Sequence, residues 1–577
     1  MAAQAAAADA LPSYADVSPP GGRRNPSGAA KHYVLAQEHL LRSSPSNPSP
    51  TTMPPPAAGL AAGALGDRHV VCFLGLPARG KQFMAERLCR YLKFFHGAQC
   101  EIFDLAKPEY GSDVELGDAL SAYLEEEDAT ATTQLIRSME GIDDDSLDRL
   151  KKNVDSGKIA ILDTSDGFST LSRAWSGATK DSRYAMQKHL ASMRVRVKLL
   201  FIEVIVSDKG VVRKFLTQRL AVGPDGERLG PQQLAGRLRA TDRALNEYGR
   251  SFVTIQDDGS EDELSYVKLI DYGDKVVTNR IRGFLLMQIV KYLSHVHPKP
   301  RTVYLSRHGQ SLYNACQKIG GNPGLTDAGE RYAKWLGEFV PGEVWTRKDG
   351  KGSDARPHSA APTDDDADEA DGPPPDTCAR PLFGRLFPCV DPSTGESSLR
   401  PIVPARLWTS TLKRTIDTAR HIPHPVLELR QGGVWHQMSP RVYRNLDEIF
   451  AGDCEGMTYK EIEETFNEES LLRKRDKLGY RYPRGESYLD LIARLDPLMH
   501  ELESYTEPLL VVSHQATLRI LYSYLVGIPR ADAPKIEIPL HNVIKITWDG
   551  WRNFEEVRIP YDDGKVPDLQ KDGQKDV

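Results

Sequence analysis

The chain contains little cysteine and no excess of charge of either sign. Its seven cysteines in 577 residues are scattered, odd in number and without any Cys-x-x-Cys pair. This usage favours reduced thiols over a disulfide framework and gives no zinc or other metal site. The 74 basic and 80 acidic residues leave a net charge of -6. That balance excludes the electrostatic footprint of a nucleic-acid or anionic-membrane binder, so we expect a small-molecule partner.

Long apolar runs are also missing. The longest strongly apolar run, residues 199–206, is interrupted by Glu203 and is far too short to span a bilayer, so we expect it to be a buried strand. The chain opens with alanines and an acidic residue, whereas a secretory signal has a basic segment before an apolar stretch. We therefore expect a cytoplasmic protein that does not enter membranes.

The sequence divides by composition into tails and two folded regions, since 577 residues exceed what one core usually holds. Residues 1–66 are rich in Ala, Pro, Ser and Gly, which predicts a disordered tail. Over residues 67–297, strand-like runs alternate with helical stretches, which predicts a parallel sheet covered by helices. We expect the last helix of this domain to cover residues 276–295, before the stiff Pro298-Lys299-Pro300 junction.

A second α/β domain is expected over residues 298–560. It is interrupted at residues 342–400 by a segment dominated by Asp, Pro, Gly and Ser, and such a long structureless run inside a domain predicts a disordered insertion. Residues 561–577 are polar and are expected to form a loose tail.

The triplet Arg307-His308-Gly309 directly follows a short β-rich run, residues 301–305. A neutral imidazole can attack phosphorus, and a neighbouring guanidinium can clamp the phosphoryl oxygens and neutralise their charge. The triplet is weak evidence by itself, because surface turns use the same residues freely.

Three downstream elements strengthen this interpretation. Arg414 falls on the first turn of a predicted helix after a short strand, where a cation and a helix N-terminus can face one anion. Glu448 offers a carboxylic acid, and a second apolar strand ends at His514. Two strand-end histidines with two arginines and one glutamate are what phosphoryl transfer through a covalent intermediate requires.

With these residues, the region from about 301 to 560 resembles the bisphosphatase domain of the 6-phosphofructo-2-kinase/fructose-2,6-bisphosphatase family, in the histidine phosphatase superfamily. The resemblance implies that His308 accepts the phosphoryl group. It implies that Glu448 protonates the departing sugar hydroxyl and later takes a proton from water. The residues implied to hold the phosphoryl group are Arg307, Asn314, Arg414 and His514.

The same resemblance implies a pocket for the sugar phosphate, made of cations, phenols and one amide. Its residues are Tyr459, Arg473, Lys477, Tyr488, Gln515 and Arg519. Such groups suit the second phosphate of a bisphosphorylated ligand. Two positions depart from the family pattern without removing an implied catalytic group: Gln310 stands where Glu is usual, and Phe450 stands where an acidic residue is usual.

The first domain contains a phosphate-loop motif from Gly75 to Gln82, after a predicted buried strand and before a helix. Backbone N–H groups and Lys81 suit the phosphates of ATP, with Gly75 and Gly80 shaping the loop. Gln82 replaces the Ser or Thr whose hydroxyl normally helps to hold Mg²⁺. By resemblance to the family's kinase domain, Asp163 is the acidic residue near magnesium.

The rest of the kinase site departs from the family. Paired arginines expected after the second strand for fructose 6-phosphate are absent from residues 103–110, and acidic residues occupy 125–127 where another arginine is usual. An acidic surface repels a phosphorylated acceptor. Arg237 and Arg239 are candidates to preserve part of that site.

The expected fold is therefore a P-loop kinase-like domain followed by a phosphoglycerate mutase-like histidine phosphatase domain. The leading hypothesis is a cofactor-independent fructose-2,6-bisphosphate 2-phosphatase whose kinase-like domain is weak or inactive. The alternatives are a fully bifunctional enzyme that uses ATP and Mg²⁺, and a noncatalytic regulator that senses sugar phosphates. The sequence leaves open whether the kinase-like domain binds ATP and whether the chain forms a homodimer.

Overall fold

The computed structural model gives the fold of most of the two predicted domains, both of which fall in the compact unit Pro55–Val577. The predicted tail 1–66, most of the predicted insertion and nearly all of the tail 561–577 lie outside the described residues. The described residues are 68–110, 112–126, 158–164, 174–221, 229–345, 386–390, 397–428, 434–550 and 553–561.

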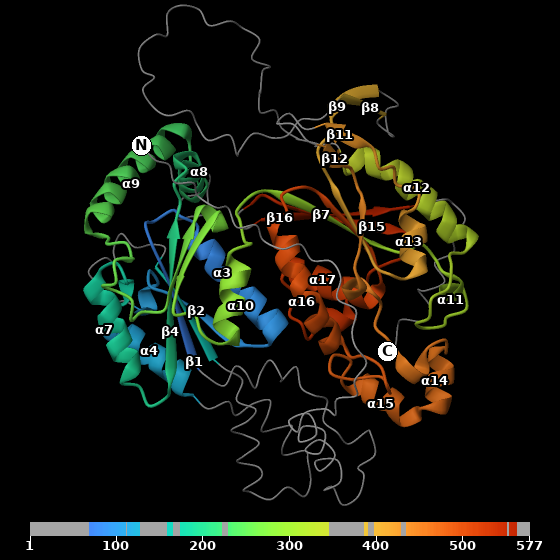
Figure 1. The fold of residues 1–577 in the computed structure, drawn as a ribbon, viewed down its shortest axis with the longest axis horizontal. Coiled ribbons are helices and arrows are strands. Elements are labelled where there is room, and N and C mark those ends of the chain that lie inside the picture. The colour runs from blue at the N-terminus through green and yellow to red at the C-terminus, as the bar shows by residue number, and fades with distance from the viewer. Residues whose placement is uncertain are drawn as a thin grey trace, which may run out of the picture. The chain divides into compact units, whose positions relative to one another are not determined.

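The first domain is built on a six-stranded sheet with the strand order β2-β3-β1-β4-β5-β6. Figure 1 labels β1, β2 and β4 of this sheet and the helices around it. Neighbouring strands are parallel from β2 to β5, and β6 runs antiparallel to β5 at the edge. The strands are β1 (Arg68–Leu74), β2 (Gln99–Asp104), β3 (Lys158–Asp163), β4 (Val197–Ile205), β5 (Tyr266–Ile270) and β6 (Lys275–Asn279).

Strand β1 is buried along its whole length because helices cover both faces of the sheet. Its alternate residues enter different apolar clusters, with Val71 and Phe73 in the cluster of α3 and α10, and Val70 and Leu74 in the cluster of α4 and α7. The helices are α3 (Lys81–Tyr91), α4 (Asp113–Glu125), α7 (Lys180–Ala191), α8 (Lys209–Leu220), α9 (Pro231–Ser251) and α10 (Phe284–Leu293), with the short helices η2 (Leu92–His96), η3 (Pro108–Tyr110), η4 (Ala174–Ser176) and η5 (Asp271–Gly273).

The helix predicted over residues 276–295 is wrong in its first part. Residues 275–279 form the edge strand β6, and the helix α10 begins only at Phe284. Val276, Val277 and Thr278 are β-branched, and they gain ladder hydrogen bonds beside β5. Tertiary pairing therefore decides the structure of a segment whose apolar spacing continues into the helix.

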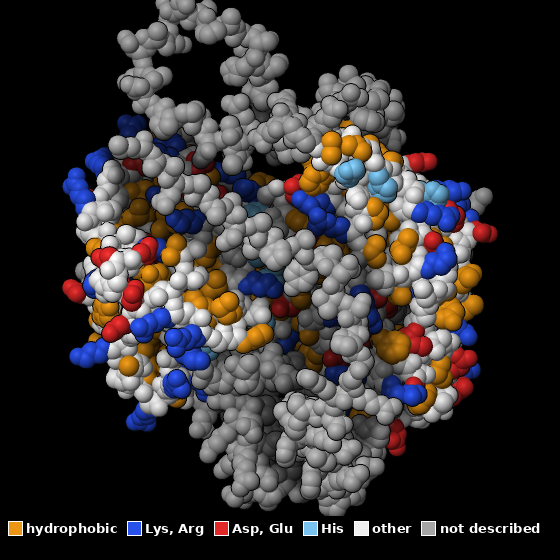
Figure 2. All heavy atoms as spheres, viewed as in Figure 1, with side chains coloured by type: hydrophobic (Ala, Val, Ile, Leu, Met, Phe, Trp, Pro, Cys, Tyr) orange, Lys and Arg blue, Asp and Glu red, His pale blue; other side chains and the backbone are white. Residues whose placement is uncertain are grey.

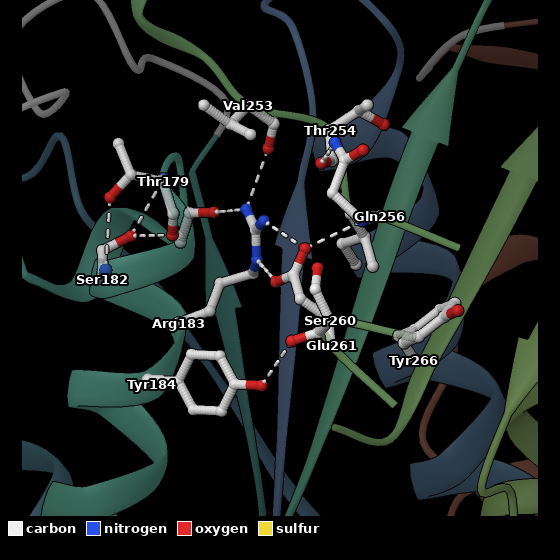
Figure 3. A network of polar contacts seen from close by, with 12 residues as sticks. Thr179, Ser182, Arg183, Tyr184, Val253, Thr254, Gln256, Ser260, Glu261 and Tyr266 are labelled. Atoms are coloured by element: carbon white, nitrogen blue, oxygen red, sulfur yellow. Dashed lines mark hydrogen bonds and ion pairs between the residues drawn. The ribbon is translucent and has the colours of Figure 1, made fainter. Parts of the chain in front are cut away.

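A buried ion pair joins α7 to the segment after α9 (Figure 3). Arg183 donates from Nε and Nη2 to the two carboxylate oxygens of Glu261, at 2.7 and 2.9 Å. Its Nη1 donates to the carbonyl oxygens of Gly177 and Val253, each at 2.9 Å. Because every group of this pair bonds within the protein, the pair is structural and offers no donor to a ligand.

The second domain has another six-stranded sheet, with the order β13-β10-β14-β7-β15-β16. The first four strands are parallel, while β15 is antiparallel to both β7 and β16. The strands are β7 (Arg301–Arg307), β10 (Arg406–Thr409), β13 (Pro440–Val442), β14 (Leu509–Ser513), β15 (Asn542–Trp548) and β16 (Phe554–Pro560).

Helices again cover both faces of this sheet. Leu305 and Val511 face the cluster that contains α16 and α17, whereas Tyr304 and Val512 face the cluster that contains α12 and α13. The helices are α11 (Leu312–Ala315), α12 (Asp327–Glu343), α13 (Lys413–Ala419), α14 (Tyr459–Thr465), α15 (Asn467–Arg475), α16 (Tyr488–Ser504) and α17 (Gln515–Val526), with the short helices η7 (Arg444–Leu446), η8 (Gly452–Cys454) and η9 (Ala533–Lys535). The two sheets confirm the predicted two-domain α/β architecture.

Two small hairpins accompany this sheet. One pairs β11 (Val426–Glu428) with β12 (Val434–His436), and the other pairs β8 (Leu386–Val390) with β9 (Ser397–Pro401). The second hairpin lies at the C-terminal end of the predicted insertion, 342–400, most of which lies outside the described residues.

The described surface carries charges of both signs. On the face shown in Figure 2, Lys and Arg side chains are interspersed with Asp and Glu side chains and with apolar ones. Among the residues that the structure describes, no helix has both the length and the apolar character needed to cross a bilayer.

Candidate active site

The two candidate catalytic histidines lie at the ends of neighbouring strands. Strands β7 and β14 are parallel and in register, with Arg307 opposite Ser513, so the next residue of each strand emerges at the same edge. The backbone N–H of His308 donates to the carbonyl oxygen of Ser513 at 3.0 Å. The ring centroids of His308 and His514 are 5.2 Å apart. The sheet itself therefore brings together two residues that are far apart in the sequence.

His308 is buried and held in one tautomer. Its Nδ1 lies 2.7 Å from the carbonyl oxygen of Gly309, so Nδ1 carries the proton and Nε2 keeps its lone pair. Burial, followed by the charges of Arg414 and Arg307, holds the pKa of His308 well below its ordinary value. A neutral imidazole with an unprotonated Nε2 is the form that can attack an electrophilic phosphorus.

Two buried arginines flank the histidines. Arg307 donates from Nη1 to the carbonyl oxygen of Ile538 at 2.9 Å, and its buried Nε has no hydrogen-bond partner among the described residues. Burial lowers the pKa of Arg307 to about 10. Arg414 donates from Nη1 to the carbonyl oxygen of Gly321 at 2.7 Å and from Nε to Nδ1 of His514 at 3.2 Å. Desolvated guanidinium groups with unused donors suit a phosphate anion.

Glu448 is the carboxylate of this cluster. Its Oε1 accepts from the N–H of Ala516, on the first turn of α17, at 3.1 Å and from its neighbour Ile449 at 3.0 Å. Its charge acts on both Arg307 and Arg414. Glu448 is only half-buried, so its carboxylate is accessible to solvent and to a ligand.

The predicted sugar-phosphate residues form a second, contiguous cationic group. The guanidinium of Arg473 lies 4.9 Å from the ring centroid of Tyr459, and Arg519 donates from Nη1 to the hydroxyl of Tyr488 at 3.0 Å. Burial, with the charges of Arg519 and Arg473, lowers the pKa of Lys477 to about 8. Arg519 and Tyr459 also act electrostatically on Arg307, which connects this group to the histidines.

Asn314 and Gln515 complete the predicted set. The Asn314 amide oxygen accepts from both the N–H and the hydroxyl of Ser311, which caps helix α11, so its amide nitrogen is the group that can donate to a ligand. Gln515 is the first residue of α17, directly after His514. The roles assigned to all these residues remain predictions.

Sequence reasoning missed several residues that touch this site. Ser410 lies against His514, Thr418 lies against Gly309, and Tyr482 packs its ring under Arg473 at 6.0 Å. The N–H of Gln310, where the family usually has Glu, donates to Nε2 of His541 at 3.0 Å. Ser410 directly follows an apolar strand, as His308 and His514 do. This position after a strand is the sequence feature that could have predicted that Ser410 lies at the site.

The phosphate-loop motif occupies the end of β1 and the start of α3. Gly75 and Gly80 have φ angles of 124° and 80°, and a Cβ at Gly75 would lie 2.6 Å from the carbonyl oxygen of Val204. Nζ of Lys81 donates to the carbonyl oxygens of Gly75 and Leu76, each at 2.9 Å. These donors and glycines fit nucleotide phosphates.

The fit to Mg²⁺ is poorer. The helix position that would supply a hydroxyl is Gln82, and Asp163, buried at the end of β3, is the one predicted acidic ligand. Within the described ranges no three His, Cys, Asp or Glu side chains are grouped so as to hold a metal ion. The loop therefore retains Lys81 and its glycines for phosphate, and Gln82 stands at the helix position where a hydroxyl usually helps to hold Mg²⁺.

The two sheets and their sites define a class: a phosphate-loop domain joined to a domain with paired strand-end histidines. In agreement with this, the sequence model for 6-phosphofructo-2-kinase matches residues 62–300, and the model for the histidine phosphatase superfamily (branch 1) matches residues 395–558. The chain belongs to the 6-phosphofructo-2-kinase/fructose-2,6-bisphosphatase family.

Three relatives illustrate this membership. A 6-phosphofructo-2-kinase/fructose-2,6-bisphosphatase of Arabidopsis thaliana is 31% identical over 513 residues, covering 86% of this chain and 55% of the relative. The enzyme of that name from Caenorhabditis elegans is 30% identical, covering 83% of this chain and 86% of the relative. A fructose-2,6-bisphosphatase of Saccharomyces cerevisiae is 29% identical, covering 82% and 85%. The chain thus spans little more than half of the first relative and most of the other two.

Proposed function

We propose that this protein hydrolyses fructose 2,6-bisphosphate at its 2-phosphate, through a phosphohistidine, to give fructose 6-phosphate and phosphate. The observation that carries the proposal is the pairing of His308 and His514 at adjacent strand ends between Arg307 and Arg414. The relative from Saccharomyces cerevisiae is named for the phosphatase activity alone. This name supports the proposal that a member of the family can have an active phosphatase domain beside a kinase-like domain that is inactive.

In the first step, the Nε2 lone pair of His308 attacks phosphorus and the bond between phosphorus and the sugar O2 breaks. Arg307 and Arg414 hold the phosphoryl oxygens, and their fixed charges neutralise the negative charge in the transition state. Glu448, in its acid form, gives its proton to the departing sugar oxygen.

In the second step, water attacks the phosphohistidine and the carboxylate of Glu448 takes a proton from that water. The bond between phosphorus and Nε2 breaks, phosphate leaves, and His308 returns to its neutral form. Burial and two neighbouring cations keep His308 neutral before each cycle.

The cationic group of Arg473, Lys477 and Arg519 supports the choice of a bisphosphorylated substrate, because it can bind the 6-phosphate while the 2-phosphate lies at His308. Tyr459 and Tyr488 add phenolic donors. No metal takes part in these steps.

For the first domain, we propose that ATP binding persists while 6-phosphofructo-2-kinase activity is weak or lost. The loop at Gly75, Gly80 and Lys81 fits the nucleotide's phosphates, and when bound with Mg²⁺ near Asp163 the nucleotide would supply a transferable phosphoryl group. The loop also keeps the bifunctional alternative open, because it retains Gly75, Gly80 and Lys81.

One purified preparation separates these functions. We incubate it with fructose 2,6-bisphosphate, and separately with fructose 6-phosphate and Mg-ATP, and measure phosphate and sugar bisphosphate. We expect phosphate from the first mixture, its loss in His308→Ala, and little product from the second. Substantial product from the second mixture would establish the bifunctional enzyme, and inactivity in both would favour a noncatalytic regulator.

A further inference from the structure

Ser410 is a buried hydroxyl that no step above uses. It directly follows β10, is fully buried, and places its Oγ 2.7 Å from Nε2 of His514. A second buried hydroxyl, Oγ1 of Thr415, lies 2.8 Å from Oγ of Ser410. Two buried hydroxyl groups in line with a catalytic imidazole can decide which of its nitrogens carries the proton.

The hydrogen-bond donors around Ser410 can be assigned in one consistent direction. Oγ1 of Thr415 lies 2.8 Å from the carbonyl oxygen of Leu412 and 3.2 Å from that of Ser410, and both can only accept, so Thr415 donates to a carbonyl, the nearer being that of Leu412. Ser410 then donates to Thr415, while its Oγ also accepts from the N–H of Leu412 at 3.1 Å. The remaining contact, with Nε2 of His514, must therefore be donated by the histidine.

The other nitrogen of His514 gives the same assignment independently. Nε of Arg414 can only donate, and it lies 3.2 Å from Nδ1 of His514. Nδ1 is therefore an acceptor, and the proton of the neutral ring is on Nε2. The relay runs from Arg414 through His514, Ser410 and Thr415 to the carbonyl oxygen of Leu412.

We propose that Ser410 is a positioning residue that keeps His514 in its Nε2–H form and that Thr415 supports it as the next member of the relay. This arrangement is the mirror image of that at His308, where the proton is on Nδ1. Each strand-end histidine thus has its protonated nitrogen bonded to a buried oxygen, Nδ1 of His308 to Gly309 and Nε2 of His514 to Ser410, and the other nitrogen of His514 accepts from Arg414 of the site.

The relay prepares His514 to bind a phosphoryl group. The inference rests on the proposed function only in placing that group beside His514. Burial, followed by the charges of Arg414, His308, Arg307 and Arg494, holds the pKa of His514 well below its ordinary value in the free protein, and the negative charge of a bound phosphate opposes these cations. A phosphate ester that enters as its monoanion then gives its proton to Nδ1 of His514 and is held as the dianion, while Arg414 turns its Nε towards the phosphoryl oxygens. Ser410 accepts from Nε2 before and after this transfer, so the ring need not rotate, and the imidazolium is stabilised by an acceptor on each side.

The test uses the full chain with three substitutions: Ser410→Ala, Thr415→Val and Thr415→Ser. Thr415→Val removes the hydroxyl and keeps the shape, while Thr415→Ser keeps the hydroxyl and removes the methyl. The ligand is inorganic phosphate, and its dissociation constant is measured from pH 5 to pH 8. The tautomer of His514 is read from ¹⁵N chemical shifts of histidine-labelled protein, with the resonance identified by its loss in His514→Gln.

We expect Ser410→Ala to weaken phosphate binding about 10-fold at neutral pH and to move its pH profile towards lower pH, because the imidazolium loses an acceptor. Thr415→Val should do the same to a smaller extent, and Thr415→Ser should match the original protein. The Nε2–H signal of His514 should be shifted or mixed in Ser410→Ala but not abolished, because Arg414 still donates to Nδ1.

The inference is overturned if Thr415→Ser disturbs binding as much as Thr415→Val, if binding weakens with no change in the pH profile, or if His514 has its proton on Nδ1 in the original protein. If Ser410→Ala fails to fold, the Thr415 pair decides alone. The phosphate and ¹⁵N measurements need no sugar substrate. A relay found together with no hydrolysis of fructose 2,6-bisphosphate would therefore reject the proposed function and keep this inference.

Discussion

The backbone N–H of Gly309 donates to Oγ1 of Thr418 at 2.8 Å, and this bond ties the loop after β7 to helix α13. Oγ1 of Thr418 in turn donates to the carbonyl oxygen of Arg414 at 2.6 Å. Because the carbonyl oxygen of Gly309 fixes the tautomer of His308, one threonine couples the nucleophile's orientation to the helix that carries Arg414.

Removing this hydroxyl should reduce both activity and stability. In Thr418→Val the side chain keeps its shape, but the buried N–H of Gly309 loses its acceptor, which costs about 1–3 kcal/mol. We expect a lower free energy of unfolding and a kcat reduced about 10-fold as the Gly309 peptide and His308 reorient. Thr418→Ser keeps the hydroxyl and should retain most of the activity. Equal kcat values for the two variants would contradict this role.

The depressed pKa of His308 predicts how stability depends on pH. Its ordinary value is 6.5, and burial with two cations holds the folded value well below that. Between the two values the unfolded chain binds the proton and the folded protein does not, so the free energy of unfolding falls as pH decreases below 6.5. Denaturant unfolding from pH 7 to pH 5 should therefore show a smaller decrease for His308→Gln than for the original protein. An unchanged slope would show that His308 is charged in the folded state.

A buried carboxylate predicts a large, pH-dependent contribution to stability. Glu503 on α16 lies 2.7 Å from Nη2 of Arg301 and accepts from the hydroxyl of Tyr524 at 2.8 Å. Glu503→Gln leaves buried positive charge without its partner and should lower the free energy of unfolding by about 3–5 kcal/mol. The matched control is Glu507→Gln, whose partner Arg406 is more exposed, with an expected loss of about 0–1 kcal/mol.

The effect of Glu503→Gln should disappear in acid. Burial alone would raise the pKa of Glu503, but the charges of Arg301 and Arg87 outweigh it and lower the pKa to about 2, from an ordinary 4.5. The stabilisation is therefore complete above pH 4.5 and is lost as pH falls towards 2. The difference in unfolding free energy between the original protein and Glu503→Gln, followed from pH 6 to pH 3, should narrow below pH 4.5. A constant difference would mean that the carboxylate has an ordinary pKa.

The phosphate loop predicts that Gln82 weakens Mg²⁺ binding, and that this weakness can be tested separately from the loss of the arginines expected for fructose 6-phosphate. Gln82→Thr restores a hydroxyl at the helix position that usually helps to hold Mg²⁺. We expect the affinity for ATP in the presence of Mg²⁺ to rise about 10-fold, with no change when the metal is chelated, measured by calorimetry. Transfer to fructose 6-phosphate should stay low, because the arginines expected for that acceptor are still absent. High kinase activity in Gln82→Thr would show that the hydroxyl alone was missing.

The sequence predicted the parts of this structure that depend on local pattern. Buried strands such as 69–74 and 158–162, and the placement of His308 and His514 after strands, follow from apolar runs and their ends. The edge strand at 275–279 was missed because its neighbour β5 decides its structure, and its own residues suit either a helix or a strand.

The contacts that tune the site could not be predicted. Ser410 meets His514, and Thr418 meets Gly309, across about a hundred residues of chain. Serine and threonine occur at caps and turns everywhere, so neither residue type nor spacing marks them. Only the register of β10, β14 and β7 brings these hydroxyls to the imidazole and to the loop.

The most direct test is to trap the covalent intermediate with fructose 2,6-bisphosphate labelled at the 2-phosphate. After rapid mixing and denaturation in alkali, where phosphohistidine is stable, the protein is digested and the labelled peptide is identified by mass spectrometry. We predict label on His308 in the original protein and none in His308→Ala. Phosphate release without any labelled histidine would contradict the account, because it would require direct attack by water.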